Sequence, residues 1–191
     1  MAIGSPAPSD VLVSREILIQ ATPPAVFEFL IDPAKLVRWM GTDAVLDPCP
    51  GGIYHVNVNG HETVSGRFVE VVPFTRVVFT RGWDDGALST PPGSSVVEVV
   101  LEPDGEGTRL RLTHRELSAD MRPFHLAGWE HYLSRLAMLA AAGDPGPDPY
   151  TKTIGTMRLG MRHLPRRYLY RFPRRRLTKW LSGRRPIARR R

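Results

Sequence analysis

The sequence predicts an α+β fold: a curved antiparallel β-sheet wrapped around a long C-terminal helix, with two short helices after the first strand and a basic C-terminal tail. Three observations predict it. Short stretches of alternating apolar residues recur between turn signals. One long segment with apolar residues at helical spacing follows them. The charge then reverses, because residues 1–150 hold 11 basic and 19 acidic residues, a net charge of −8, whereas residues 151–191 hold 15 basic residues and no acidic residue.

The first strand and the two short helices are predicted between residues 11 and 39. Residues 11–20 alternate between apolar and polar residues, which is typical of a strand with one buried face. Thr22 and the two prolines after it are typical of a helix N-cap and first turn. Asp32 and Pro33 repeat this arrangement, so we expect a second short helix there.

The rest of the sheet is predicted between residues 42 and 113. Residues 53–59 alternate and end in Asn59-Gly60, a pair that favours a hairpin. Several short strands at near-regular spacing favour an antiparallel sheet. The further strands are expected at residues 64–72, 76–81, 96–101 and 108–113.

A long helix is predicted from Ser118 to Ala142, and it is the only predicted element long enough to cover the sheet. Gly128 lowers the stability of a helix by about 1 kcal/mol relative to alanine. We therefore expect a reason for the small residue, either tight packing of the helix on the sheet or the close approach of a ligand. The apolar stripe of the helix comprises Phe124, Gly128, Trp129, Tyr132, Leu133, Leu136 and Leu139.

A series of short motifs runs through residues 10–142. The motifs are the segment 21–27, Asp32-Pro33 with Trp39, Pro50-Gly51-Gly52, the segment 66–68, Pro73 before the segment 76–80, the segment 108–110, the segment 112–114, and Gly128-Trp129. In this order they resemble the SRPBCC superfamily, also called START-like or helix-grip. The resemblance is to the branch of the C-terminal domain of activators of the heat-shock-protein-ninety ATPase. Phe27 stands where that family more often has tryptophan, and residues 151–191 have no counterpart in it.

The resemblance implies the helix-grip fold with an apolar pocket between the concave face of the sheet and the last helix. The alternative is that the aromatic side chains there simply fill the core. His114 also has two interpretations, as an acid or base in the pocket near neutral pH or as a hydrogen-bonded structural histidine. The candidate ligand-binding residues are Trp39, Tyr54, Phe68, Phe79, Trp83, His114, Phe124, Trp129 and Tyr132.

The fold does not imply one activity, because the superfamily includes lipid and small-molecule carriers, aromatic polyketide cyclases, hormone receptors and co-chaperone domains. The function we expect is non-catalytic binding of an apolar small molecule or lipid, and no catalytic residue is assigned. The first alternative is a chaperone-modulating interaction domain of the stress response. The second is a small enzyme that resembles the polyketide cyclases.

The sequence lacks the common patterns for metal, phosphate and cofactor binding. Cys49 is the only cysteine, no His-Glu-x-x-His pattern occurs, and no glycine-rich loop continues into Gly-Lys-Ser or Gly-Lys-Thr. We therefore expect neither a metal nor a cofactor. The longest apolar run, residues 136–142, is far below the ~20 residues that a membrane span needs, and the first ten residues lack a signal-peptide pattern. These features favour a cytoplasmic protein without a transmembrane segment.

We expect four parts: a flexible N-terminus at residues 1–9, the domain at 10–142, a Pro/Gly linker at 143–150, and a partly amphipathic or disordered tail at 151–191. Arginine clusters interleaved with aromatic residues favour contact with an anionic membrane surface or a nucleic acid. The alternatives are a non-specific disordered extension and a stretch translated in a shifted frame or past a gene boundary. The candidate contact residues are Arg166, Arg167, Arg174, Arg175, Arg176 and Trp180.

Overall fold

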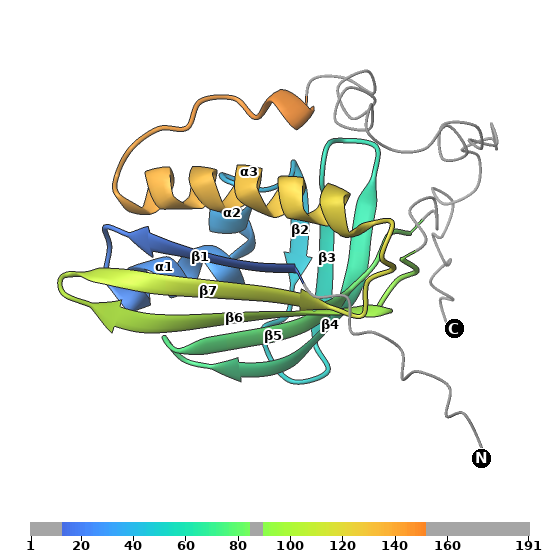
Figure 1. The fold of residues 1–191 in the computed structure, drawn as a ribbon, viewed down its shortest axis with the longest axis horizontal. Coiled ribbons are helices and arrows are strands. Elements are labelled where there is room, and N and C mark those ends of the chain that lie inside the picture. The colour runs from blue at the N-terminus through green and yellow to red at the C-terminus, as the bar shows by residue number, and fades with distance from the viewer. Residues whose placement is uncertain (1–12, 85–89, 152–191) are drawn as a thin grey trace, which may run out of the picture.

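The computed structural model describes residues 13–84 and 90–151. Figure 1 shows a curved sheet with one long helix lying across it, which confirms the predicted α+β fold. The anionic-surface or nucleic-acid contacts predicted between Arg166 and Trp180 lie outside the described residues, and the four-part division of the chain stays a prediction.

The described residues form one antiparallel sheet of seven strands. The order in the sheet is β1-β7-β6-β5-β4-β3-β2, so the first strand pairs with the last one. Between β1 and β2 the chain crosses from one edge of the sheet to the other. The strands are β1 (Val13–Ile19), β2 (Asp43–Leu46), β3 (Ile53–Asn57), β4 (Thr63–Val72), β5 (Arg76–Arg81), β6 (Ser95–Asp104) and β7 (Gly107–Arg115).

Two short helices make this crossing, and a third, long helix covers the sheet. Asp32 ends α1 and caps α2, because its Oδ1 accepts hydrogen bonds from the backbone N–H groups of Ala34 and Lys35 at 2.8 and 3.2 Å. The cap confirms the start that the sequence predicts for the second helix. The helices are α1 (Pro23–Ile31), α2 (Pro33–Leu36) and α3 (Arg122–Ala140), and a short 3-10 turn, η1 (Pro149–Thr151), follows.

The long helix begins later than predicted. α3 starts at Arg122, whereas the sequence pattern predicts a start at Ser118. The reason is Pro123, which lacks a backbone N–H and would clash with the carbonyl four residues earlier if it lay inside a helix. A proline is tolerated in the first turn, which is where α3 has it.

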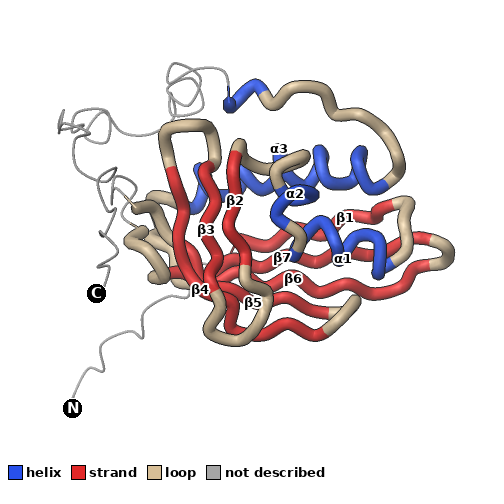
Figure 2. The backbone as a smooth tube through the Cα atoms, turned by 180° about the vertical axis from the view of Figure 1, so that it is seen from behind, coloured by secondary structure: helices blue, strands red, loops and turns tan. Residues whose placement is uncertain are grey.

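The sheet bends at β4, where β2 and β3 turn away from the direction of β5, β6 and β7 (Figure 2). A Cβ atom at Gly66 would lie 1.9 Å from the carbonyl oxygen of Thr80, so only glycine allows β5 to come this close. The pairing of β4 with β5 is also irregular between Phe68 and Glu70. Such a bulge bends a strand and increases its twist.

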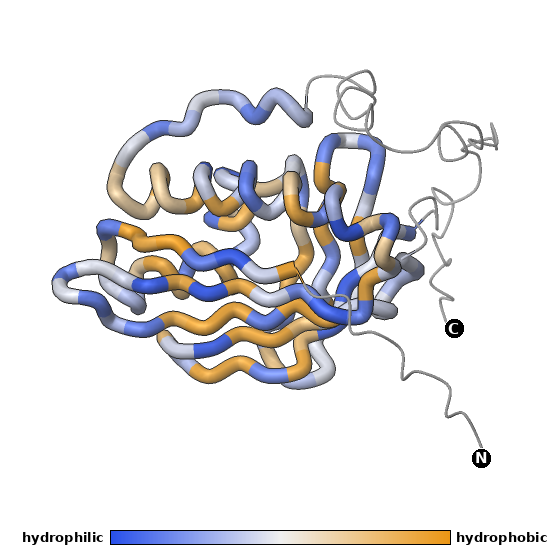
Figure 3. Tube along the Cα trace, viewed as in Figure 1, coloured by the Kyte–Doolittle hydropathy of each residue, from blue (hydrophilic) through white to orange (hydrophobic). Residues whose placement is uncertain are grey.

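The inner face of the central strands is apolar for most of its length and polar at one end. The inward residues of β5 are Val77, Phe79 and Arg81, and all three are buried. Arg81 pairs with Ser95 of β6, and the ring of His114 on β7 contacts the Ser95 side chain. Figure 3 shows the alternation of apolar and polar residues along these strands. We call Arg81, Ser95 and His114 the polar end of the interior.

The tight packing on the sheet that was one expectation for Gly128 is absent from the described chain, and the close approach of a ligand stays a prediction. A Cβ atom built on Gly128 would meet no atom within 4 Å, although the residue lies inside α3. Neither tight packing against the sheet nor any other part of the described chain explains the glycine.

We expect the substitution Gly128→Ala to raise the free energy of unfolding by about 1 kcal/mol, because alanine has the higher helix propensity and its Cβ has space. Urea unfolding followed by far-UV circular dichroism measures the change. Gly66→Ala is the matched control, because there the same added methyl group collides with the backbone of Thr80 and should destabilise the fold. A loss of stability in Gly128→Ala would show that the added methyl group meets a part of the protein and that the glycine has a packing role.

Candidate functional site

The space between α3 and the inner face of the sheet is almost filled. It contains an apolar cavity with about 10 Å³ of room for the centre of a water molecule. A single bound water needs roughly 10–15 Å³ by this measure. This cavity therefore has room for about one water.

The nine predicted ligand-binding residues all meet in or around this interior. Trp39, Tyr54, Phe79 and Trp129 line the cavity, together with aliphatic side chains from α1, α2, β6, β7 and α3. Phe68 packs edge-on against the ring of Tyr54, with 5.7 Å between the ring centroids. Their roles as ligand contacts stay predictions, because the same packing would also serve a filled core.

The other predicted residues lie closer to the polar end. Trp83 packs against Phe124 with 6.0 Å between the ring centroids, and Phe124 belongs to the first turn of α3. His114 and Tyr132 are buried. The structure thus brings together side chains from strands β3, β4, β5 and β7, from the segments after α2 and β5, and from both halves of α3.

His114 sits in a chain of hydrogen bonds that uses both of its ring nitrogens. The hydroxyl of Ser95 donates to the backbone carbonyl of Arg81 at 2.7 Å, so its oxygen accepts from Nε2 of His114 at 2.8 Å. The indole N–H of Trp129 donates to Nδ1 of His114 at 3.1 Å. This network requires a neutral ring with its proton on Nε2. Burial, and then the charge of Arg81, lower the pKa of His114 well below its ordinary value. The arrangement favours the structural interpretation of His114 over acid–base catalysis.

Arg81 is a functional candidate that is absent from the residues predicted from sequence. Its side chain points inward and the residue is only 6% exposed. The central carbon of its guanidinium lies 5.1 Å from the ring centroid of Trp129 and 5.7 Å from that of Trp83. Its Nε has no hydrogen-bond partner, and no carboxylate of the described chain forms an ion pair with it. Burial lowers the pKa of Arg81, but a guanidinium stays charged in proteins, so Arg81 is a buried positive charge without a counter-charge among the described residues.

Several buried polar atoms near Arg81 also lack partners within the described chain. They are the hydroxyls of Tyr54 and Tyr132, Nε1 of Trp83 and Nε2 of His125. Both tyrosines and His125 lie within electrostatic reach of Arg81. Because most buried polar groups in proteins are hydrogen-bonded, to protein or to ordered water, such a concentration needs an explanation.

Burial away from water shifts the pKa values of the side chains at the polar end. Burial raises the pKa of the Tyr54 hydroxyl to about 12, although the charge of Arg81 opposes the shift. Burial also lowers the pKa of His125 to about 3, and the charge of Arg81 adds to this effect. At neutral pH the tyrosines are therefore protonated hydrogen-bond donors and His125 is a neutral ring.

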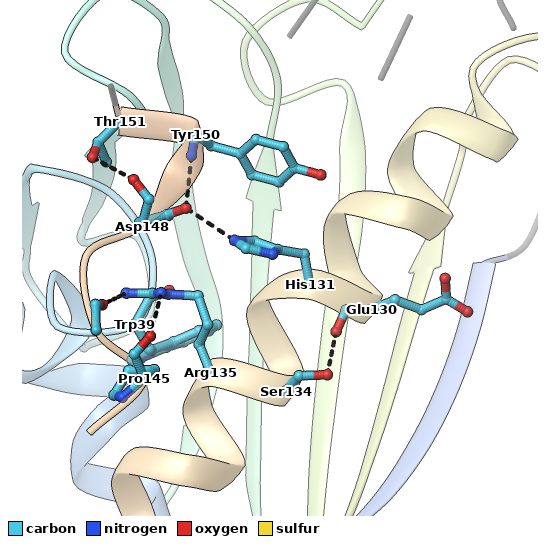
Figure 4. A network of polar contacts seen from close by, with 10 residues as sticks. Trp39, Glu130, His131, Ser134, Arg135, Pro145, Asp148, Tyr150 and Thr151 are labelled. Carbon is cyan, nitrogen blue, oxygen red and sulfur yellow. Dashed lines mark hydrogen bonds and ion pairs between the residues drawn. The ribbon is translucent and has the colours of Figure 1, made fainter. Parts of the chain in front are cut away.

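Arg135, the other buried arginine of the described chain, makes three structural hydrogen bonds. Its Nε donates to the backbone carbonyl of Trp39 at 3.1 Å, and its Nη atoms donate to the carbonyls of Pro145 and Gly146 at 3.4 and 3.0 Å (Figure 4). These bonds fasten residues 143–151, which include the predicted linker, against the C-terminal half of α3. Arg135 is thus a buried arginine with a structural role, and Arg81 differs from it.

A second contact holds the same segment. Nε2 of His131 lies 2.9 Å from Oδ1 of Asp148, which also accepts the backbone N–H of Tyr150 at 2.9 Å (Figure 4). Burial opposes ionisation of Asp148, but the hydrogen bonds from His131 and Tyr150 outweigh it and lower the pKa of the carboxyl group. The C-terminal half of α3 is thus tied down at two points.

Comparison with known proteins shows the family to which this chain belongs. Residues 20–141 match the family described as activator of Hsp90 ATPase homolog 1-like protein. The chain belongs to this family. An AHSA1-like protein of Rhizobium etli is 50% identical, with a TM-score of 0.61 over 74% of this chain and 89% of that one. No curated protein matches the chain.

More distant members of the same fold extend the comparison. A protein of Chromobacterium violaceum is 24% identical, with a TM-score of 0.61 over 72% of this chain and 98% of that one. The Aha1 dimer of Colwellia psychrerythraea is 19% identical, with a TM-score of 0.61 over 70% of this chain and 98% of that one. At this distance the likeness concerns the fold alone.

Two further observations concern metal sites and membrane spans in this AHSA1-like domain. In the described residues, no group of three or more His, Cys, Asp or Glu side chains is placed to hold a metal ion. None of the described helices has the length and apolarity to cross a membrane.

A signal for Arg81 is present in the sequence. Val77, Phe79 and Arg81 follow one another at a spacing of two, so a strand over residues 76–81 directs all three to the same face. Val77 and Phe79 are apolar, so this face is expected to be the inner one. Arg81 then points inward as well. Arg135 gives a weaker signal, because it lies one residue away from the apolar stripe of the helix.

The two buried histidines should make the fold sensitive to mild acid. His125 stays neutral in the folded state down to about pH 3, whereas the unfolded chain takes up the proton near an ordinary pKa of about 6.5. Below about pH 6.5 the unfolded state therefore binds more protons, and the free energy of unfolding falls. We expect a loss of about 1 kcal/mol from His125 between about pH 7.5 and about pH 5.5, and a further loss from His114.

Urea unfolding at these two pH values measures the effect. His125→Gln should reduce the pH dependence, whereas the matched change His61→Gln, at an exposed histidine, should preserve it. Equal stability of the unmodified protein at both pH values would show that the histidines are not held neutral in the interior.

Proposed function

We propose that the interior between the sheet and α3 binds a small, largely apolar molecule without transforming it. The observation that supports this is the group of unpartnered polar atoms beside the apolar cavity. Tyr54 belongs to both, because its ring lines the cavity and its hydroxyl lacks a partner. An apolar space with a few polar groups at one end is the usual composition of a small-molecule site.

Binding requires the interior to open, because the cavity has room for only about one water. The first turn of α3 has no side-chain cap. Beyond that turn, Trp129 and Glu130 tie the N-terminal half to β7 and β1, and Arg135 and His131 hold the C-terminal half. A cap contributes typically about 1 kcal/mol to a helix, so its absence favours opening beside Phe124 and the polar end.

The chemistry of the interior supports binding rather than catalysis. Both nitrogens of His114 are engaged in structural hydrogen bonds. The other buried histidine of the described chain is His125, and its Nε2 is unpartnered. A pKa of about 3 makes that ring a poor base near neutral pH.

Modulation of a chaperone is the alternative function, and a different part of the surface supports it. The hairpin of β4 and β5 exposes Val69, Val72 and Phe74, with 52%, 39% and 49% of their surfaces accessible. Exposed apolar side chains that cluster on one hairpin favour a protein partner. The stress-response role and the cytoplasmic location that accompany this function stay predictions.

The two functions predict different sites for a neutral apolar dye. We expect N-phenylnaphthylamine to bind the full chain in the interior, with a saturable rise in its fluorescence. Val99→Phe should abolish this signal, because Val99 lines the cavity and the larger ring fills it. Circular dichroism checks that this variant is folded.

The matched control is Val69→Phe, the same change at a half-exposed residue on the outer face of β4. It should leave the dye signal unchanged. If the dye fluorescence were unchanged in Val99→Phe and reduced in Val69→Phe, the dye would bind at the hairpin. That result would overturn the interior site.

A further inference from the structure

We propose that the ligand of this interior carries a carboxylate group and that Arg81 is the residue that recognises it. The inference rests on the proposed binding function and narrows the ligand to a small apolar or aromatic carboxylic acid. Arg81 would bind the carboxylate, while the apolar part of the molecule would occupy the space lined by Tyr54, Phe79 and Trp129.

The buried guanidinium of Arg81 has no counter-charge within residues 13–84 and 90–151. Burying a single charge costs several kcal/mol, and a protein ordinarily offsets this with an ion pair or several hydrogen bonds. The ion pairs of the described residues all involve other side chains, and Arg81 is in none of them. Arg135 shows the ordinary solution, since three backbone carbonyls surround its guanidinium. Within the described chain, Arg81 has neither an ion pair nor a comparable set of hydrogen bonds.

Two aromatic rings hold the guanidinium and leave its edge available. Trp83 and Trp129 lie 5.7 and 5.1 Å from its central carbon, so the cation rests against aromatic rings. Stacking stabilises a cation and uses the flat face of the group. The planar edge with its N–H donors is then left for a partner, and an edge of this kind binds a carboxylate through two parallel hydrogen bonds.

The neighbouring unpartnered atoms are mostly hydrogen-bond donors. Nε1 of Trp83 is a donor only, and the protonated hydroxyls of Tyr54 and Tyr132 are donors as well. Nε2 of His125 becomes a donor in one of the two neutral tautomers. A carboxylate has about four lone-pair sites and accepts only, so it complements this set. The buried carboxyl group of the described chain, Asp148, lies within electrostatic reach of Tyr132, but its Oδ1 is engaged by His131 and by the backbone N–H of Tyr150.

The size of the charge points to a monoanion. Arg81 is the one cationic side chain buried at this end of the described interior. One guanidinium neutralises a single negative charge. A carboxylate meets this requirement, whereas a phosphate monoester would bring close to two negative charges at neutral pH.

The test compares two probes of nearly equal shape on the full chain, the naphthoate anion and the uncharged naphthamide. Quenching of tryptophan fluorescence reports binding, because Trp83 and Trp129 adjoin the guanidinium. We expect naphthoate to bind at least tenfold more tightly than naphthamide. In Arg81→Met the two probes should bind with equal affinity, and Arg81→Lys should keep part of the preference because it keeps the charge.

Each outcome supports or overturns the proposal. If the unmodified protein binds both probes equally, the carboxylate inference is wrong and the apolar binding function stands. If it binds neither probe nor the neutral dye, the binding function itself fails. If Arg81→Met keeps the preference for naphthoate, another cationic segment of the chain holds the acid and Arg81 does not. The two probes are first compared on the unmodified protein. This comparison can overturn the inference even if the Arg81 variants fail to fold.

Discussion

A positive charge forced into an apolar interior is the constraint on which this structure depends. Strand β5 can bury Val77 and Phe79 only by turning Arg81 inward with them, because alternate residues of a strand share a face. A shift of the register by one residue would expose the apolar pair. The rings of Trp83 and Trp129 pack against the cation, and the chain of hydrogen bonds through His114 and Ser95 ends on the Arg81 carbonyl.

The long helix divides this interior into two ends with different properties. Arg135, His131 and the segment 143–151 tie down the C-terminal half of α3 over an apolar, well-packed core (Figure 4). The N-terminal half has no side-chain cap and covers the polar end, where donors without partners gather. An uncapped first turn beside unsatisfied donors suits a site that opens for a ligand, because binding loops and moving elements come from the less stable parts of a fold.

The sequence predicts the architecture better than the site, and particular residues show why. The strand over residues 76–81 is confirmed at both ends, since its pattern and the flanking turns are local features. The predicted helix start is too early because Ser118 resembles a cap, whereas Pro123 belongs to the first turn. The aromatic residues are correctly gathered in one interior, but their alternation says nothing of volume, and the structure leaves room for about one water. The role of Arg81 depends on which strand ends meet across the sheet, and only the register of β5, β6 and β7 decides that.

The central claim is that Arg81 is retained for a ligand and not for stability. The most direct test is the free energy of unfolding of two matched variants, Arg81→Met and Arg135→Met, in protein freed of bound molecules by unfolding and refolding. Because no carboxylate in the described part of the chain pairs with the buried Arg81, an apolar side chain of similar size should leave the stability unchanged or higher. Arg135→Met should lower it, since three backbone carbonyls lose their donors. A loss of stability in Arg81→Met as large as that in Arg135→Met would contradict the claim, because it would make Arg81 a structural residue like its counterpart.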